Sequence, residues 1–201
     1  MALDLHALIQ SYAKRNPQEK DKAQCFLHFL SQPTTSLHHL TGSSWLIHPE
    51  TKHVLLTHHK KLKRWLQLGG HMEPHDADIF QTALREAKEE SGLNNLTPIS
   101  TEIFHLGIHT IPHNETANDP KHPRWQSVLG EESNSHYHFD VCFLHAVEPD
   151  DAERISASDE SHEIAWFPLS RILTMASPDS QLHTMAKKWQ IMAFEEALEP
   201  A

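Results

Sequence analysis

The 201-residue chain has few of the residues that mark several large protein classes. Its two cysteines, Cys25 and Cys142, are too few for a disulfide framework or a four-thiolate zinc site. No stretch approaches the roughly 20 apolar residues of a membrane-spanning helix, and the first residues lack the basic and apolar regions of a secretory signal. We therefore expect a cytoplasmic protein without a membrane partner.

Positive charge is also scarce, because 17 Lys and Arg face 27 Asp and Glu, for a formal net charge of −10. This balance argues against a partner such as long nucleic acid. Histidine is abundant instead, with 19 residues that follow no single zinc-binding spacing. We expect most of them to be solvated or packed.

The apolar pattern changes near residue 40, from helical spacing to short runs typical of strands. Two helices are predicted before that point, about 5–15 and 18–30. Later elements are predicted as strands at 44–48, 54–58, 99–111, 136–147 and 163–167, and as helices at 78–90, 168–175 and 181–198. The fold class is therefore α/β, with a mixed sheet flanked by helices. We predict an N-terminal helical extension over 1–40 and one domain over 41–201.

The helix predicted over 78–90 carries the most informative residues. Asp78 is suited to cap its N-terminus, and Gly92 to end it in a left-handed conformation. Glu86, Glu89 and Glu90 follow at i, i+3 and i+4, so their carboxylates cluster on one flank near the negative end of the helix dipole. A hard divalent cation would relieve this repulsion.

The positions of the glycines favour a metal site on this helix over an acidic face that is merely solvated. The chain has only six glycines, and Gly69, Gly70 and Gly92 bracket this one helix. Without a side chain, Gly70 would let its backbone carbonyl approach an ion closely. Oxygen donors of this kind suit Mg²⁺ or Mn²⁺ as cofactor.

The segment resembles the Nudix box, in which a glycine and an acidic residue precede the pattern Arg-Glu-apolar-x-Glu-Glu-x-Gly-apolar. Residues 85–93 match this second half at every position. The first half fits with one extra residue in the loop, which makes Gly70 the box glycine and Asp76 the box acid. The Leu-Gly-Gly-His lead at 68–71 is similar to a subgroup in which histidine follows the glycine pair.

The resemblance implies a Nudix α/β/α sandwich and a pyrophosphohydrolase that cleaves a nucleoside diphosphate linked to another moiety X. It implies that Glu86, Glu89, Glu90 and the Gly70 carbonyl bind Mg²⁺ or Mn²⁺, which activates a water for attack on phosphorus. It further implies that Arg85 pairs with Asp76 and braces the loop. The general base would be a box glutamate, Glu89 or Glu90, or an acid before the late strand; there we favour Glu160 over Glu163.

Substrate contacts are expected from His136, His138 and Trp125. His136 and His138 alternate along a strand, where they would contact substrate, bind a transition metal or form a solvated face. Trp65 and Trp125 are further candidates for stacking on a base, or simply anchors in the core and a loop. The polar stretch 111–135 is longer than most connections, which is typical of functional loops.

Several alternatives stay open. A Nudix-fold sensor would bind a nucleotide without cleaving it, although it need not keep all three box carboxylates. An isopentenyl-diphosphate-isomerase-like enzyme would require an active-site cysteine and a histidine-rich metal site. An RNA-end pyrophosphohydrolase conflicts with the acidic composition. The moiety X is not identified by the box, and a homodimer is compatible with the helical extension.

Overall fold

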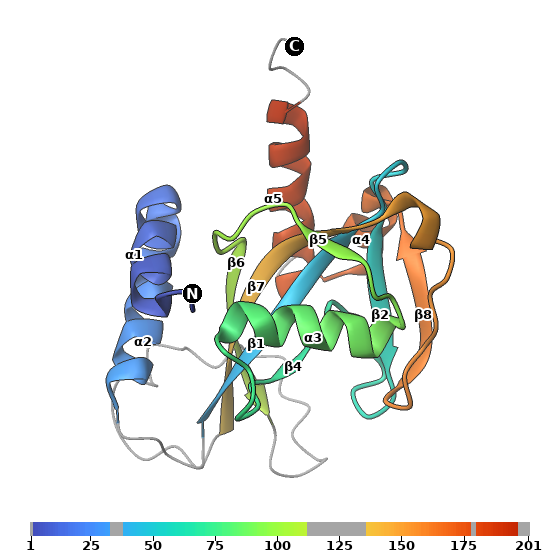
Figure 1. The fold of residues 1–201 in the computed structure, drawn as a ribbon. Helices are drawn as coiled ribbons and strands as arrows, with labels where there is room; N and C mark the ends of the chain where they lie inside the picture. Colours follow the sequence, from blue (N-terminus) through green and yellow to red (C-terminus); the bar gives the residue numbers. More distant parts are fainter. Residues whose placement is uncertain (1, 33–37, 112–135, 178–179, 197–201) are drawn as a thin grey trace. The chain divides into compact units, whose positions relative to one another are not determined.

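The computed structural model describes residues 2–32, 38–111, 136–177 and 180–196 (Figure 1). The helices described are α1 (Leu5–Arg15), α2 (Lys20–Ser31), α3 (Ile79–Ser91), α4 (Leu169–Met175) and α5 (Gln181–Glu196), with short 3-10 helices at Pro17–Glu19 and Pro149–Asp151. The strands described are β1 (His38–Ile47), β2 (Val54–His59), β3 (Arg64–Leu66), β4 (Leu68–His71), β5 (Leu96–Pro98), β6 (His105–Ile111), β7 (His136–Val147) and β8 (Ser161–Phe167).

These strands form one sheet in the order β3-β2-β1-β7-β5, with β4 beside β1, β6 beside β7 and β8 beside β2. The five pairs whose register is described are antiparallel. Between β1 and β7, side-chain hydrogen bonds advance in the same direction along both strands, from Thr41–Asp140 to Ser44–His145. This order indicates a parallel pair, and the predicted mixed sheet with helices is confirmed.

The described residues fall into two compact units. The first draws on 1–43, 69–86 and 100–143, and the second on 44–68, 87–99 and 144–201. The boundaries pass through β1, β4, α3 and β7, so each of these elements contributes residues to both units.

The N-terminal helices are part of the core of the first unit. α1 and α2 lie side by side (Figure 1), and their buried Tyr12 and Phe26 belong to one cluster with Phe80 of α3 and Phe139 of β7. Phe26 meets the Phe139 ring edge-on, with the ring centroids 5.1 Å apart. The two predicted helices are therefore confirmed, while the domain boundary at residue 41 stays a prediction.

Gly42 brings β1 into direct contact with the first turns of α3. A Cβ atom at this position would lie 2.7 Å from the carbonyl oxygen of Ile79 and 2.9 Å from the amide nitrogen of Ala83. Only glycine permits such an approach of strand to helix backbone. The position of α3 over this strand is thus set by backbone contact.

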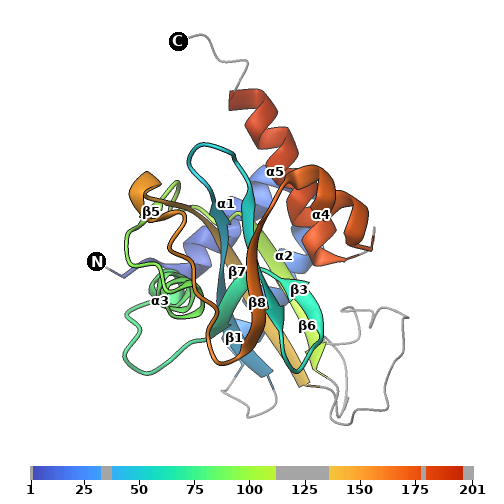
Figure 2. The same cartoon turned by 90° about the vertical axis from the view of Figure 1, so that its right-hand side faces the viewer.

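In the second unit, β8 runs along β2, from Val54 opposite Phe167 to His59 opposite Ser161 (Figure 2). Trp65 of β3 packs on Phe167, with ring centroids 4.6 Å apart. Trp166 donates a hydrogen bond from Nε1 to the carbonyl oxygen of Ala152, at 2.9 Å. α4 and α5 pack against each other, and both appear where helices were predicted.

The strand predictions differ from the structure at the starts of β1 and β6, and the short strands β3, β4 and β5 were not predicted. β1 begins at His38 instead of residue 44, because its first half is stabilised by polar contacts: Asp140 accepts hydrogen bonds from Thr41 and Ser43. The strand predicted over 99–111 begins only at His105. The preceding residues form bends, and β5 is too short for its apolar pattern to be recognised.

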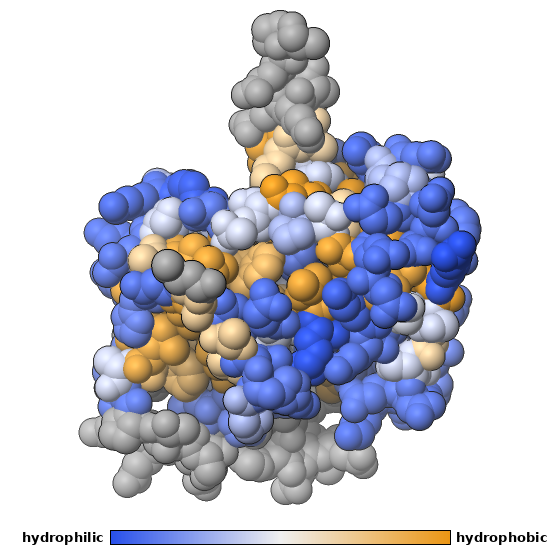
Figure 3. Space-filling view, viewed as in Figure 1, coloured by the Kyte–Doolittle hydropathy of each residue, from blue (hydrophilic) through white to orange (hydrophobic). Residues whose placement is uncertain are grey.

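The face of the first unit that Figure 3 draws at the left has hydrophobic side chains over α1 and α2. Partly buried hydrophobic residues of these two helices pack against the core, among them Leu5, Leu8 and Leu30. In the second unit, α5 exposes Ile191, Met192 and Phe194. Within the described residues, no helix combines the length and the apolar character needed to cross a bilayer.

Candidate functional site

The ends of α3 are formed by the residues that the sequence predicts. The Asp78 carboxylate accepts a hydrogen bond from the amide of Gln81 at 2.9 Å, as an N-cap does. Its other oxygen accepts from the amide of Leu3 at 2.7 Å, which ties the start of the chain to this helix. Gly92 has φ +72° and ends the helix in the left-handed conformation.

The three box glutamates emerge from α3 at different depths. Phe80, Ala83 and Ala87 are buried, so they fix the inner face of the helix. On the flank, the Glu86 side chain is 16% exposed and Glu90 is 7% exposed, while Glu89 is exposed. The helix therefore carries carboxylate oxygens at a buried position (Glu90), a partly buried position (Glu86) and an exposed position (Glu89).

The Glu86 carboxylate lies directly against Gly70 at the end of β4. A Cβ atom on Gly70 would lie 2.6 Å from the carboxyl carbon and 2.6 and 2.7 Å from its oxygens. The missing side chain thus creates the space that the carboxylate fills, next to the Gly70 backbone. A carboxylate and a backbone carbonyl on adjoining elements are donors suited to a hard divalent cation, so these residues fit Mg²⁺ or Mn²⁺.

We expect Gly70→Ala to displace this carboxylate without unfolding the protein. The three atoms nearest to the added methyl group belong to the end of the flexible Glu86 side chain, which has to shift to make room. Affinity for Mg²⁺ or Mn²⁺ should fall by about 10- to 100-fold, the range seen when the support of a metal ligand is disturbed. Metal titration by calorimetry measures the loss, and an unchanged melting temperature without metal is the control. Unchanged affinity would separate Gly70 from the metal site.

Arg85 and Asp76 form a bidentate ion pair within the first unit. Nε and Nη2 of Arg85 donate to the two carboxylate oxygens of Asp76, both at 3.0 Å. Thr82 also donates to this carboxylate at 3.0 Å, and the amide of Glu73 at 2.9 Å. These hydrogen bonds, that of Arg85 above all, lower the pKa of Asp76 to about 2.

The same guanidinium connects the loop to β4 and to the Glu86 carboxylate. Arg85 Nη2 donates to the carbonyl oxygen of His71, and Nη1 to a carboxylate oxygen of Glu86, both at 2.9 Å. Its contacts with Asp76 and Glu86 raise the pKa of Arg85, so it stays charged. The geometry makes Arg85 a brace that orients Glu86 from the protein side.

Glu160 and Glu163 lie in the second unit at the start of β8. Both side chains are exposed. The backbone carbonyl of Glu160 accepts from the amide of Lys60 at 3.0 Å, so the turn before β8 is fixed to the end of β2. Glu163 lies opposite His58 in the β2–β8 ladder.

The predicted substrate contacts are described only in part. His136 begins β7 opposite Ile111, and His138 follows two residues later, opposite His109. Trp125 lies outside the described residues. Trp65, the other aromatic candidate, has ring contacts with Phe167 and His58.

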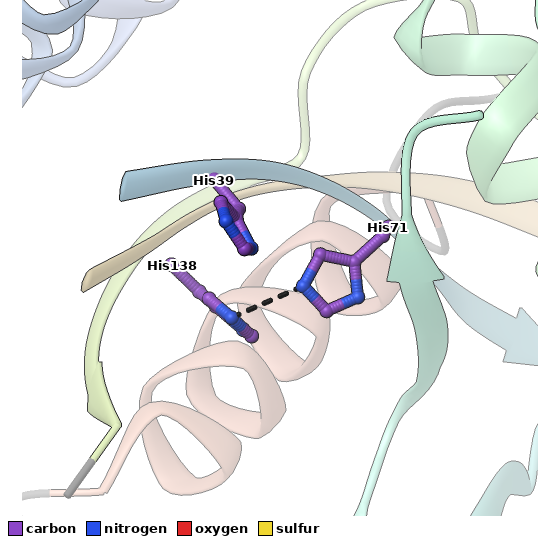
Figure 4. Close-up of side chains that lie close together, drawn as sticks. All are labelled: His39, His71 and His138. Carbon is purple, nitrogen blue, oxygen red and sulfur yellow. Dashed lines mark hydrogen bonds between the residues drawn. The ribbon is translucent and has the colours of Figure 1, made fainter. Parts of the chain in front are cut away.

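A histidine cluster in the first unit was not recognised from the sequence. His39 of β1, His71 of β4 and His138 of β7 place one ring nitrogen each within 4.8 Å of the others (Figure 4). Of these, only His138 was identified as a candidate, because it alternates with His136. His39 and His71 come from other strands, and only the strand order brings them together.

The two cysteines are both buried, Cys25 in α2 and Cys142 in β7. Burial raises the pKa of the Cys25 thiol, with a smaller contribution from the charge of Asp21. Neither cysteine belongs to the histidine cluster. These features give no support to isomerase-like chemistry that depends on a reactive thiol.

Comparison with known proteins gives a consistent family match. Residues 38–188, well over half of the chain, match the sequence profile of the NUDIX domain. No curated protein significantly matches the chain in sequence.

Several solved structures share the fold. An Ap4A hydrolase binary complex from C. elegans has a TM-score of 0.54 at 17% identity, covering 78% of this chain and 98% of that one. A MutT protein from Methanosarcina mazei Go1 has a TM-score of 0.53 at 17% identity, with 80% and 99% covered. The dihydroneopterin triphosphate pyrophosphohydrolase of E. coli has a TM-score of 0.53 at 14% identity, with 78% and 99% covered. Each of these is similar to this chain in fold.

Proposed function

Since the chain belongs to the NUDIX domain family and is a hydrolase of pyrophosphate bonds, we propose that it cleaves a nucleoside diphosphate linked to a moiety X. Its partner is then a small molecule and not a long nucleic acid. The location proposed is the cytoplasm, and a homodimer is compatible with the N-terminal helices. The polyphosphate substrates named for the neighbouring structures belong to the same broad chemical class.

The observation that carries this proposal is the contact of the Glu86 carboxylate with Gly70, on the helix that also bears Glu89 and Glu90. We assign Glu86, Glu89, Glu90 and the Gly70 carbonyl as ligands of Mg²⁺ or Mn²⁺. When bound, the ion neutralises the pyrophosphate charge and lowers the pKa of the attacking water. The protein holds Glu86 in place through Arg85, as its hydrogen bond at 2.9 Å supports.

We also propose that Asp76 is the box acid, displaced by one extra loop residue before α3. Its bidentate pairing with Arg85 supports the assignment, because that pair fixes the loop to the helix. With Gly70 as the box glycine, His71 then occupies the position after the glycine pair, as in the Gly-Gly-His subgroup. Arg85, Asp76 and Gly92 have structural roles in this assignment.

Glu160 is our proposed general base, with Glu163, Glu89 and Glu90 as its rivals. The fixed backbone and exposed carboxylate of Glu160 support this choice. We expect Glu160→Gln to lower kcat by about 10²- to 10⁴-fold and to remove the acidic limb of the pH–rate profile. Glu163→Gln is the matched control and should retain activity. The reverse pattern would assign the base to Glu163, and full activity of both variants would leave a box glutamate.

His136, His138 and Trp125 remain our candidates for substrate contact. Hydrolysis is tested with a panel of nucleotide sugars, dinucleoside polyphosphates, ADP-ribose and oxidised nucleoside triphosphates in the presence of Mg²⁺ or Mn²⁺. Release of a nucleotide from one class of compound identifies X. Tight, metal-dependent nucleotide binding without turnover would instead support a sensor.

A further inference from the structure

Three neighbouring strands each carry a histidine to the same point of the sheet. β1 lies between β4 and β7 there, and the rings of His39, His71 and His138 point toward one another (Figure 4). Nε2 of His71 and Nε2 of His138 are 3.2 Å apart. The His39 ring lies 5.1 Å from the ring of His71 and 5.6 Å from that of His138, measured between centroids.

We propose that His39, His71 and His138 bind a transition-metal ion of the Zn²⁺ class, at a site distinct from the carboxylates of α3. Imidazole nitrogen suits Zn²⁺, Cu²⁺ and Ni²⁺, whereas Mg²⁺ prefers oxygen donors. The chain thus offers two donor sets of different chemistry. Because the ligands are assigned by donor type and position, the inference does not depend on the proposed hydrolysis.

The separation of two of the three donor nitrogens matches what zinc requires. Two nitrogens bound tetrahedrally at about 2.0–2.1 Å from Zn²⁺ are separated by roughly 3.3 Å. The observed 3.2 Å between His71 and His138 is already at this value. Every donor nitrogen lies within 4.8 Å of the others, so the third imidazole reaches the ion by a small side-chain rotation.

The strands beneath the cluster are fixed by a buried carboxylate. Asp140, two residues after His138 on β7, accepts from Thr41 at 3.0 Å and from Ser43 at 2.6 Å. Thr41 is likewise two residues after His39 on β1. Since alternate residues of a strand share a face, this network sets His39 beside His138 before any ion binds.

A further imidazole borders the cluster. His109 of β6 lies directly opposite His138 in the antiparallel ladder, so both side chains are on the same face. Four adjacent strands, β4, β1, β7 and β6, therefore present a row of histidines. Three ligands leave one position of a tetrahedral ion open, for water or a group of a bound molecule.

The test measures Zn²⁺ binding to the full chain by competition with a chromophoric chelator, and the visible spectrum of Co²⁺ in the same site. We expect one tightly bound equivalent and the absorption of tetrahedral Co²⁺ with nitrogen ligands. His71→Gln and His138→Gln should each weaken Zn²⁺ binding by at least about 100-fold. His6→Gln, at an exposed position of α1, is the matched control and should have no effect.

The Glu89→Gln/Glu90→Gln variant separates the two sites and should keep its Zn²⁺ affinity. Loss of Zn²⁺ binding in that variant, or full affinity in both histidine variants, would overturn the proposal. Because His71 is exposed, its replacement leaves the core intact, and melting temperature confirms that the variant folds. Wild-type protein without any stoichiometric Zn²⁺ or Co²⁺ binding would also refute it.

Discussion

Replacing Glu89 and Glu90 together by glutamine is expected to lower kcat/KM at least about 1,000-fold, a loss of about 4 kcal/mol of transition-state stabilisation. Glutamine keeps the size of each side chain and removes its charge. The proposed site then loses two of its three carboxylates, while the Glu86 contact with Gly70 remains. Steady-state kinetics with the substrate identified by the panel measures the change.

The same variant should fold at least as well as the wild-type protein when no metal is present. In the wild-type protein, the carboxylates of Glu89 and Glu90 lie near the negative end of the α3 dipole. Each anion there is unfavourable by a few tenths of a kcal/mol, and the variant lacks both. The increase in melting temperature on adding Mg²⁺ should disappear, since stabilisation by a ligand requires its site. Glu50→Gln/Glu153→Gln changes the same charge at exposed positions and should leave both activity and this increase intact. Wild-type kinetics in the site variant would contradict the assignment.

The frame of the candidate site was predictable because its information is local. Each of its features depends on residues about one helical turn apart. These features are the N-cap at Asp78, the left-handed end at Gly92 and the glutamates at helical spacing. The Asp76–Arg85 pair is nearly local as well, since the two residues are nine positions apart in the sequence. Because these residues are close in sequence, their contacts can be predicted from spacing alone.

The histidine cluster could not be predicted in the same way. His39 and His138 are 99 residues apart, and their proximity depends on β7 lying beside β1. The first half of β1 lacks an apolar pattern because its inward residues Thr41 and Ser43 bind Asp140. Polar side chains that satisfy one another inside a sheet look like loop residues in the sequence, so the strand and its histidine both went unrecognised.

A second strong effect is expected in the pH dependence of stability, through His145 of β7. Its side chain is fully buried, and Nδ1 lies 3.0 Å from the Ser44 hydroxyl oxygen. Burial lowers the pKa of His145 from 6.5 to about 4. The folded protein therefore holds this ring neutral at pH values where the unfolded chain already binds a proton.

Protonation of the unfolded chain makes its free energy more favourable as pH falls. The contribution of His145 to the free energy of unfolding is complete above pH 6.5 and is lost progressively as pH falls toward 4. The loss is about 1.4 kcal/mol per pH unit, or about 3 kcal/mol in all.

His145→Gln carries no titrating group, so its stability should depend less on pH over this range. Urea unfolding of both proteins at pH 7, 6, 5 and 4.5 gives the difference directly. His162→Gln, at an exposed position of β8, should keep the wild-type slope. Equal slopes for wild type and His145→Gln would mean that the buried ring accepts a proton in the folded protein.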